Sequence, residues 1–207
     1  MLKPTHRHYL LVIACLLLFS SVKAQKTDSA FSAITVNSAM KDTFTFAKHW
    51  AYAWDVFKNE TTGKFETMIG DRATAKDTAH FYFTANCTTN LQGGYKIKYC
   101  YAQKTGDSIR LIFSDGMPAY ASLFHVNIYN GQHYFKPETI YPVQYKGETK
   151  TYKITSQELV LNKSKYNRGE IIMGYINAEF TETVTVPGKG TNDKKLYLKG
   201  YIRTRLK

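Results

Sequence analysis

The sequence predicts an all-β fold, a single antiparallel β-sandwich or closed barrel of about nine or ten strands. Two observations lead to this prediction. The chain of 207 residues contains 16 Tyr and 12 Phe, and aromatic side chains pack well on the pleated surface of a sheet. Many apolar side chains also recur at every second position, which is the period of a strand with one buried face. A chain of this length suits one domain.

The first 24 residues have the pattern of an export signal. Basic residues precede an apolar run from Tyr9 to Phe19, and small residues follow it up to a predicted cleavage point before Gln25. We therefore expect a secreted or periplasmic protein. The residues up to Cys15 also resemble the lipobox of a lipoprotein, but the apolar run continues beyond that cysteine. Lipidation at Cys15 is therefore the less favoured alternative.

After the signal, the chain divides into a short segment and one domain. Residues 25–42 have weak periodicity, and we expect this N-terminal segment to be partly disordered. Residues 43–207 are predicted to form the β-domain. Its first strand is expected from Phe44 to Val56, although the same apolar residues also share one helical face. A turn-like stretch at 58–63 favours a strand, a loop and a second strand.

A tight hairpin is predicted at Asn130-Gly131, because this dipeptide tolerates the positive φ angles of a type I′ turn. In the resulting register, His125 and His133 fall on opposite faces of the sheet and cannot share a metal ion. None of the histidines after residue 24 forms a His-x-His or His-x-x-x-His pair. We therefore expect neither a metal site nor a cofactor.

A second hairpin is predicted around Gly93-Gly94, between strands at 81–87 and 95–102. Counting outward from a two-residue loop places Cys87 opposite Cys100, at a spacing that a disulfide can bridge. Because exported proteins normally meet an oxidising compartment, we expect these two cysteines to be bonded. Two free, buried thiols are the alternative.

The C-terminal part of the chain predicts four further strands, at 108–114, 151–161, 170–186 and 195–206. The last two should pair antiparallel across a loop at 187–193. In the last strand one face is apolar, and the other is aromatic and basic. Such a face can stack on sugar rings and neutralise anions. The predicted ligand-binding residues are Tyr197, Lys199, Tyr201, Arg203 and Arg205.

Glu182 is the most informative carboxylate, because it has the strand parity of Phe180 and Val184 and should point toward the interior. A second acid facing it across a cleft would suit a hydrolase. The other carboxylates in or beside predicted strands are Glu158, Glu170 and Glu179.

Charge indicates which partners to expect. Removal of residues 1–24 takes away three basic residues and no acidic one, so the net charge falls from +12 to +9. A basic domain favours anionic glycans, lipopolysaccharide or another envelope partner. No specific nucleic acid is expected, and no second apolar stretch is long enough for a transmembrane helix after signal cleavage.

Motifs of catalysis are missing from the sequence, which has no Gly-x-Ser-x-Gly elbow and no glycine-rich phosphate loop. We therefore expect an exported, non-enzymatic β-domain that binds an anionic or carbohydrate ligand or a cell-envelope partner. A secreted hydrolase with a carboxylate pair in a β-cleft is one alternative. A small outer-membrane β-barrel is another, although both parities of several strands carry charged residues.

Overall fold

The computed structural model describes residues 31–52, 56–59, 61–67, 70, 72–75, 80–91, 96–115, 122–141 and 143–207. The predicted export signal and the Gly93-Gly94 turn lie outside these residues. In the described part nearly all regular structure is β, as the sequence predicts. The 3-10 helix η2 spans Thr45–Lys48, and no helix among the described residues is long and apolar enough to cross a membrane.

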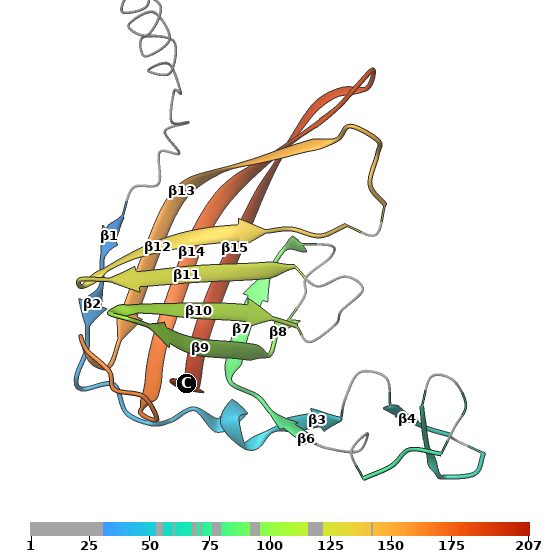
Figure 1. The fold of residues 1–207 in the computed structure, drawn as a ribbon, viewed down its shortest axis with the longest axis vertical. Coiled ribbons are helices and arrows are strands. Elements are labelled where there is room, and N and C mark those ends of the chain that lie inside the picture. Colours follow the sequence, from blue (N-terminus) through green and yellow to red (C-terminus); the bar gives the residue numbers. More distant parts are fainter. Residues whose placement is uncertain are drawn as a thin grey trace, which may run out of the picture.

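Two sheets face each other around the core, and their strands cross at a steep angle (Figure 1). The described residues close neither sheet into a barrel. The five-stranded sheet contains, in spatial order, β1 (Ser32–Ala33), β12 (Gln132–Glu138), β11 (Leu123–Tyr129), β10 (Ser108–Ser114) and β9 (Tyr99–Thr105). The six-stranded sheet contains β2 (Thr35–Val36), β13 (Thr149–Leu161), β14 (Ile171–Val186), β15 (Gly190–Arg205), β7 (Ala85–Thr89) and β8 (Lys96–Ile97).

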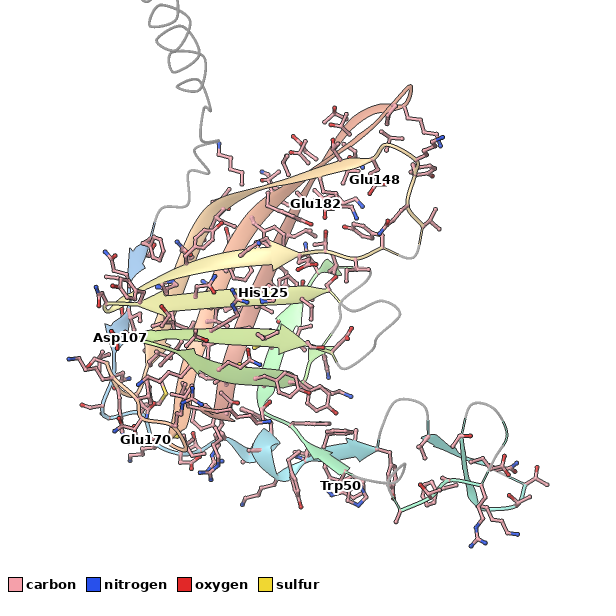
Figure 2. All side chains as sticks on the ribbon, in the orientation of Figure 1. Trp50, Asp107, His125, Glu148, Glu170 and Glu182 are labelled. Atoms are coloured by element: carbon pink, nitrogen blue, oxygen red, sulfur yellow. The ribbon has the colours of Figure 1, made fainter. Side chains whose placement is uncertain are left out.

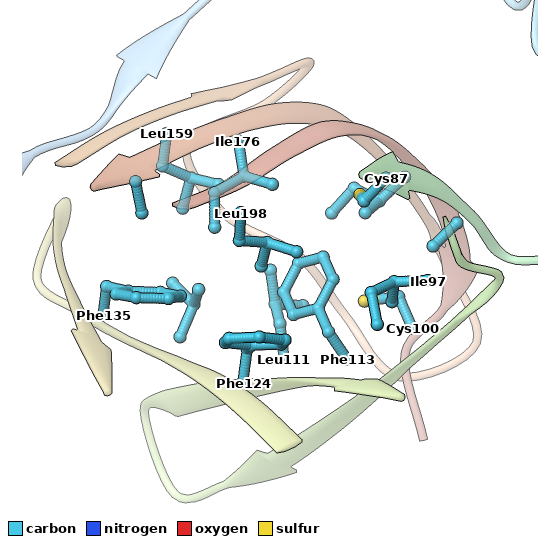
Figure 3. Packing of buried hydrophobic residues seen from close by; sticks show 14 of the residues in the cluster. Cys87, Ile97, Cys100, Leu111, Phe113, Phe124, Phe135, Leu159, Ile176 and Leu198 are labelled. Carbon is cyan, nitrogen blue, oxygen red and sulfur yellow. The ribbon is translucent and has the colours of Figure 1, made fainter. Parts of the chain in front are cut away.

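Alternation of apolar and polar residues places one face of each sheet in the core, because successive side chains of a strand point to opposite faces. Phenylalanines from both sheets meet at the centre. The rings of Phe124 and Phe135 lie 6.0 Å apart, and Phe135 lies 5.6 Å from Phe180 of β14. Leu159, Ile176 and other aliphatic side chains complete this core (Figure 3).

The Asn130-Gly131 hairpin has the predicted register. Tyr129 pairs with Gln132 across the turn, and the turn residues have φ angles of 48° and 72°. His133 is buried on the core face, whereas His125 lies on the outer face of the same sheet. The pairing of β14 with β15 is also as predicted, but β15 begins at Gly190. Most of the expected loop at 187–193 is therefore strand.

The region before β7 differs from the prediction of one continuous strand from Phe44 to Val56. It contains η2, β3 (Trp50–Tyr52) and β4 (Val56–Lys58), while residues 53–55 lie outside the described part. β3 pairs with β6 (His80–Tyr82), and β4 pairs with β5 (Phe65–Thr67). Both small pairs lie outside the two main sheets, and β4 is farther from them than β3 (Figure 1). The spacing of the aromatic residues on this segment is compatible with both a strand and a helix. Periodicity alone therefore could not show where the strands begin and end.

Residues 31–42, the part of the N-terminal segment that the structure describes, contain two short strands. Ser32 pairs with His133, and Thr35 pairs with Val160 in a parallel arrangement. Backbone hydrogen bonds from Ile34 to Gly131 and from Asn37 to Leu161, each 2.9 Å long, hold the segment across both sheets. Its polar sequence gives no periodic signal because these strands have only two residues each.

The predicted cysteine register is wrong. Cys87 pairs with Ile97 of β8 and with Gly200 of β15, whereas Cys100 lies on β9 opposite Phe113. Both cysteines are free thiols that point into the core (Figure 3). β7 ends at Thr89 and β8 begins at Lys96, and the partner of Cys87 is displaced by three positions from the predicted one. Burial raises the pKa of Cys87 to about 12, so its thiol is protonated at neutral pH.

Candidate functional site

The candidate site lies where the hairpin β14–β15 extends beyond the five-stranded sheet (Figure 1). β12 ends at Glu138, and the chain then runs through residues 139–148 before β13 begins. We call residues 139–148 the strap; position 142 is outside the described part. Glu148 and Glu182 lie in the region between the strap and the hairpin (Figure 2). A cleft of about 510 Å³ separates the strap from the hairpin.

Strand register explains which side chains of the six-stranded sheet point toward the strap. Tyr152, Glu182 and Lys194 are directly opposite one another on β13, β14 and β15, so their side chains project from the same face. This is also the face that carries Phe180 in the core. The inner face of the six-stranded sheet therefore continues past the core, where the strap replaces the facing sheet.

Glu182 anchors the inner end of the cleft. Its carboxylate is fully buried and accepts hydrogen bonds from the hydroxyls of Thr139 and Tyr141, the latter at 2.7 Å. The Tyr152 hydroxyl lies 2.8 Å from Thr139 Oγ1 and accepts a bond from the Thr139 amide. Buried carboxylates require such donors. Burial, followed by the neighbouring Glu182, raises the pKa of Tyr141, so this phenol remains a donor at neutral pH.

Three lysines surround the rings of the strap. The ammonium groups of Lys150 and Lys194 lie 4.7 and 4.4 Å from the centre of the Tyr141 ring. Lys189, at the hairpin end, lies 3.9 Å from the ring centre of Tyr145. A cation over an aromatic face is stabilised by the ring quadrupole. The tyrosines therefore help to hold Lys189 and Lys194, which line the cleft, and Lys150, which is not among its lining residues.

Only one of these lysines forms an ion pair with a described residue. Lys150 Nζ lies 3.2 Å from Glu148 Oε1. The pKa of Glu148 is lowered mainly by the Tyr145 amide, which donates to its other oxygen, and further by the positive charges of Lys150 and Lys194. Neither Lys189 nor Lys194 pairs with a carboxylate in the described part of the chain. Lys189 and Lys194 therefore line the cleft without a direct ion pair, although the Glu148 carboxylate also lines it and interacts electrostatically with Lys194.

The predicted face of β15 has the expected alternation. Leu196, Leu198 and Ile202 are buried, and the five predicted residues alternate with these positions on β15. Tyr197 borders a separate cavity of about 430 Å³. Lys199 is exposed between Tyr197 and Tyr201.

The side chains of three of the five predicted residues contact neighbouring parts of the protein. Arg203 forms a two-point ion pair with Asp42, with Nε 3.0 Å from one oxygen, and Arg205 donates to the Gly169 carbonyl. The Tyr201 ring packs against Phe44 and Tyr175. These contacts secure the surrounding segments against β15, and the guanidinium groups are already bonded within the protein.

The four carboxylates expected from the sequence do not converge. Glu158 and Glu179 are exposed and have the strand parity opposite to that of the core, and Glu170 pairs with Lys163 at 2.9 Å. Only Glu182 faces inward. No group of three or more His, Cys, Asp or Glu in the described residues could hold a metal ion.

Sequence reasoning found Glu182 but missed Tyr141, Tyr145, Glu148 and the three lysines. Residues 141–153 mix tyrosines with charged residues, as an ordinary surface loop and strand do, and Lys189 and Lys194 lie well outside this stretch. Comparison with protein-family models, curated proteins and solved structures finds no match for this chain. The site must therefore be interpreted from its own chemistry.

Proposed function

We propose that this chain is an exported, non-enzymatic β-domain that binds a small anionic ligand in the cleft between the strap and hairpin β14–β15. One observation carries the proposal: Lys189 and Lys194 are held over tyrosine rings at this cleft without an ion pair among the described residues. An anion placed there gains charge-assisted hydrogen bonds. The volume of the cleft is within the usual range for small-molecule sites.

Other features of the chain support the same proposal. The basic charge of residues 25–207 attracts anions over longer distances. Export rests on the signal pattern of the first 24 residues. A periplasmic or secreted location would bring the domain into contact with acidic glycans, lipopolysaccharide and other envelope components, which are the partners that the charge favours.

Direct catalysis by Glu182 is disfavoured by its environment. A general acid or nucleophile must reach the substrate, but this carboxylate is fully buried and already accepts bonds from Thr139 and Tyr141. We assign it instead to positioning the strap. The aromatic and basic face of β15, Tyr197 to Arg205, is the alternative ligand surface.

Binding measurements on variants test the proposal. The full chain is titrated with inorganic phosphate, a sulfated disaccharide and octanoate at low and moderate salt, using calorimetry. For whichever of these anions binds the unmodified protein, the double variant Lys189→Gln, Lys194→Gln should lower the affinity by about ten-fold or more. The matched control, Lys153→Gln with Lys165→Gln, removes two exposed charges away from the cleft and should bind as the unmodified protein does.

Two outcomes would contradict this assignment. Equal binding by the cleft variant and the control would remove the lysines from the site. Loss of binding only in a Tyr201→Ala, Lys199→Gln variant would place the ligand on the outer face of β15.

A further inference from the structure

The inner face of β14 remains apolar beyond the core. Val184 and Val186 have the same strand parity as Ile176 and Phe180, but they lie past Glu182, where the five-stranded sheet no longer covers them. Both valines are half-buried and line the cleft. Valines at an inward-facing parity normally pack against another layer, and here that place is occupied by the cleft.

The strap presents apolar surface to the same cleft. Val143 is 65% exposed and Tyr145 is 46% exposed, and both line it. Four apolar side chains from two sides thus border a space that has positive charges at Lys194 and Lys189, and a negative charge at Glu148 that is paired with Lys150. A small inorganic anion would satisfy the ammonium groups but leave these side chains in water. An uncharged apolar molecule would cover these side chains but leave the ammonium groups without an anionic partner.

We propose that the ligand is an amphipathic anion, such as a medium-chain carboxylate or another acid with a comparable apolar body. This inference rests on the proposed function. The acidic group lies at Lys194, whose position is fixed by its place opposite Glu182 and by the Tyr141 ring. The apolar body lies along Val143, Val184 and Val186. Burial of hydrocarbon then adds to the charge interaction.

A chain-length series tests this assignment. The full chain is titrated with acetate, hexanoate, octanoate and decanoate, all below micelle-forming concentrations, and with inorganic phosphate, 1-octanol and octylamine. Each additional buried CH₂ should tighten carboxylate binding by up to about four-fold. Octanoate should bind at least ten-fold more tightly than octanol or octylamine.

Variants assign the two parts of the ligand. Lys194→Gln should weaken octanoate binding by about ten-fold, with Lys153→Gln as the matched control. Val184→Asn should flatten the dependence on chain length and leave acetate binding unchanged. Val36→Asn alters an exposed valine of β2 and should preserve the dependence. Circular dichroism confirms that each variant is folded.

The failures are distinguishable. Lys194-dependent binding of phosphate or acetate with no gain from a longer chain would overturn the amphipathic ligand and leave the proposed anion site standing. Equal binding of octanol, octylamine and octanoate would overturn the assignment of the acidic group. Binding that ignores both Lys189 and Lys194 would overturn the proposed function as well.

Discussion

The Tyr141 hydroxyl donates a 2.7 Å hydrogen bond to Oε1 of Glu182, and this bond joins the strap to the inner face of hairpin β14–β15. It also fixes the ring over which Lys150 and Lys194 place their ammonium groups. The buried carboxylate therefore helps to position Lys194 at the cleft, although it does not line the cleft itself.

Removal of this bond should destabilise the protein. In Tyr141→Phe the buried Glu182 carboxylate loses one of its two described donors, which should lower the free energy of unfolding by about 1–3 kcal/mol. Urea unfolding measures the change. Tyr129→Phe is the matched control, because the Tyr129 side chain is exposed. Equal midpoints for the two variants would show that the bond contributes nothing measurable.

Gly200 should tolerate no side chain. Its φ angle is +153°, and an added Cβ would lie 2.2 Å from the Asn86 carbonyl oxygen and 2.5 Å from Cys87 Cα. Because both atoms belong to the backbone of β7, Gly200→Ala should cost about 3 kcal/mol or more. Gly188→Ala, at a turn with open space around it, should cost about 1 kcal/mol. Similar losses would mean that β7 does not approach β15 this closely.

Stability should decrease in mild acid because of His133. Burial lowers the pKa of this histidine below its usual 6.5, so the unfolded chain binds a proton more readily than the folded one. The free energy of unfolding should therefore fall as the pH drops from about 7 through 6.5, and level off below the folded pKa. His125, whose pKa is also lowered mainly by burial, contributes in the same direction.

The His133→Phe variant isolates this contribution. It should show a shallower pH dependence between pH 7.5 and 5.5 than the unmodified protein, in urea unfolding at each pH. His80→Phe, which changes an exposed histidine, should leave the dependence unchanged. An unaltered slope in His133→Phe would assign the acid sensitivity to other groups.

The two cysteines should react slowly in the folded protein. Burial raises the pKa of Cys87 to about 12 and raises that of Cys100 well above its usual value, and only the thiolate is the reactive form. Iodoacetamide at neutral pH should label both at least a hundred-fold more slowly in buffer than in urea. Rapid labelling in buffer would contradict burial, and no labelling in urea would indicate a disulfide.

Short-range patterns in the sequence predicted much of the β structure. Period-2 alternation identified β14 and β15, and the Asn130-Gly131 dipeptide fixed the register of β11 and β12. Alternation also placed Glu182 in the interior. These features depend on residues close together in the chain, where turn type and strand parity determine the result.

Features that depend on distant contacts were not predictable in this way. The register between β7 and β8 depends on a connection whose length the glycines do not define, so the position of Cys87 was misjudged. The cleft requires the strap to fold over a hairpin about forty residues later. Nothing in the local pattern around Tyr141 and Lys194 indicates that these side chains meet.

The central claim is that the cleft between the strap and the hairpin is the ligand site. The most direct test is an NMR titration of the ¹⁵N-labelled full chain with octanoate. Binding in the cleft predicts saturable shifts in the backbone amides of Val143, Tyr145, Val184, Val186 and Lys194, with those of Tyr197 to Arg205 little changed. Shifts confined to Tyr197 to Arg205, or none at all, would contradict the account.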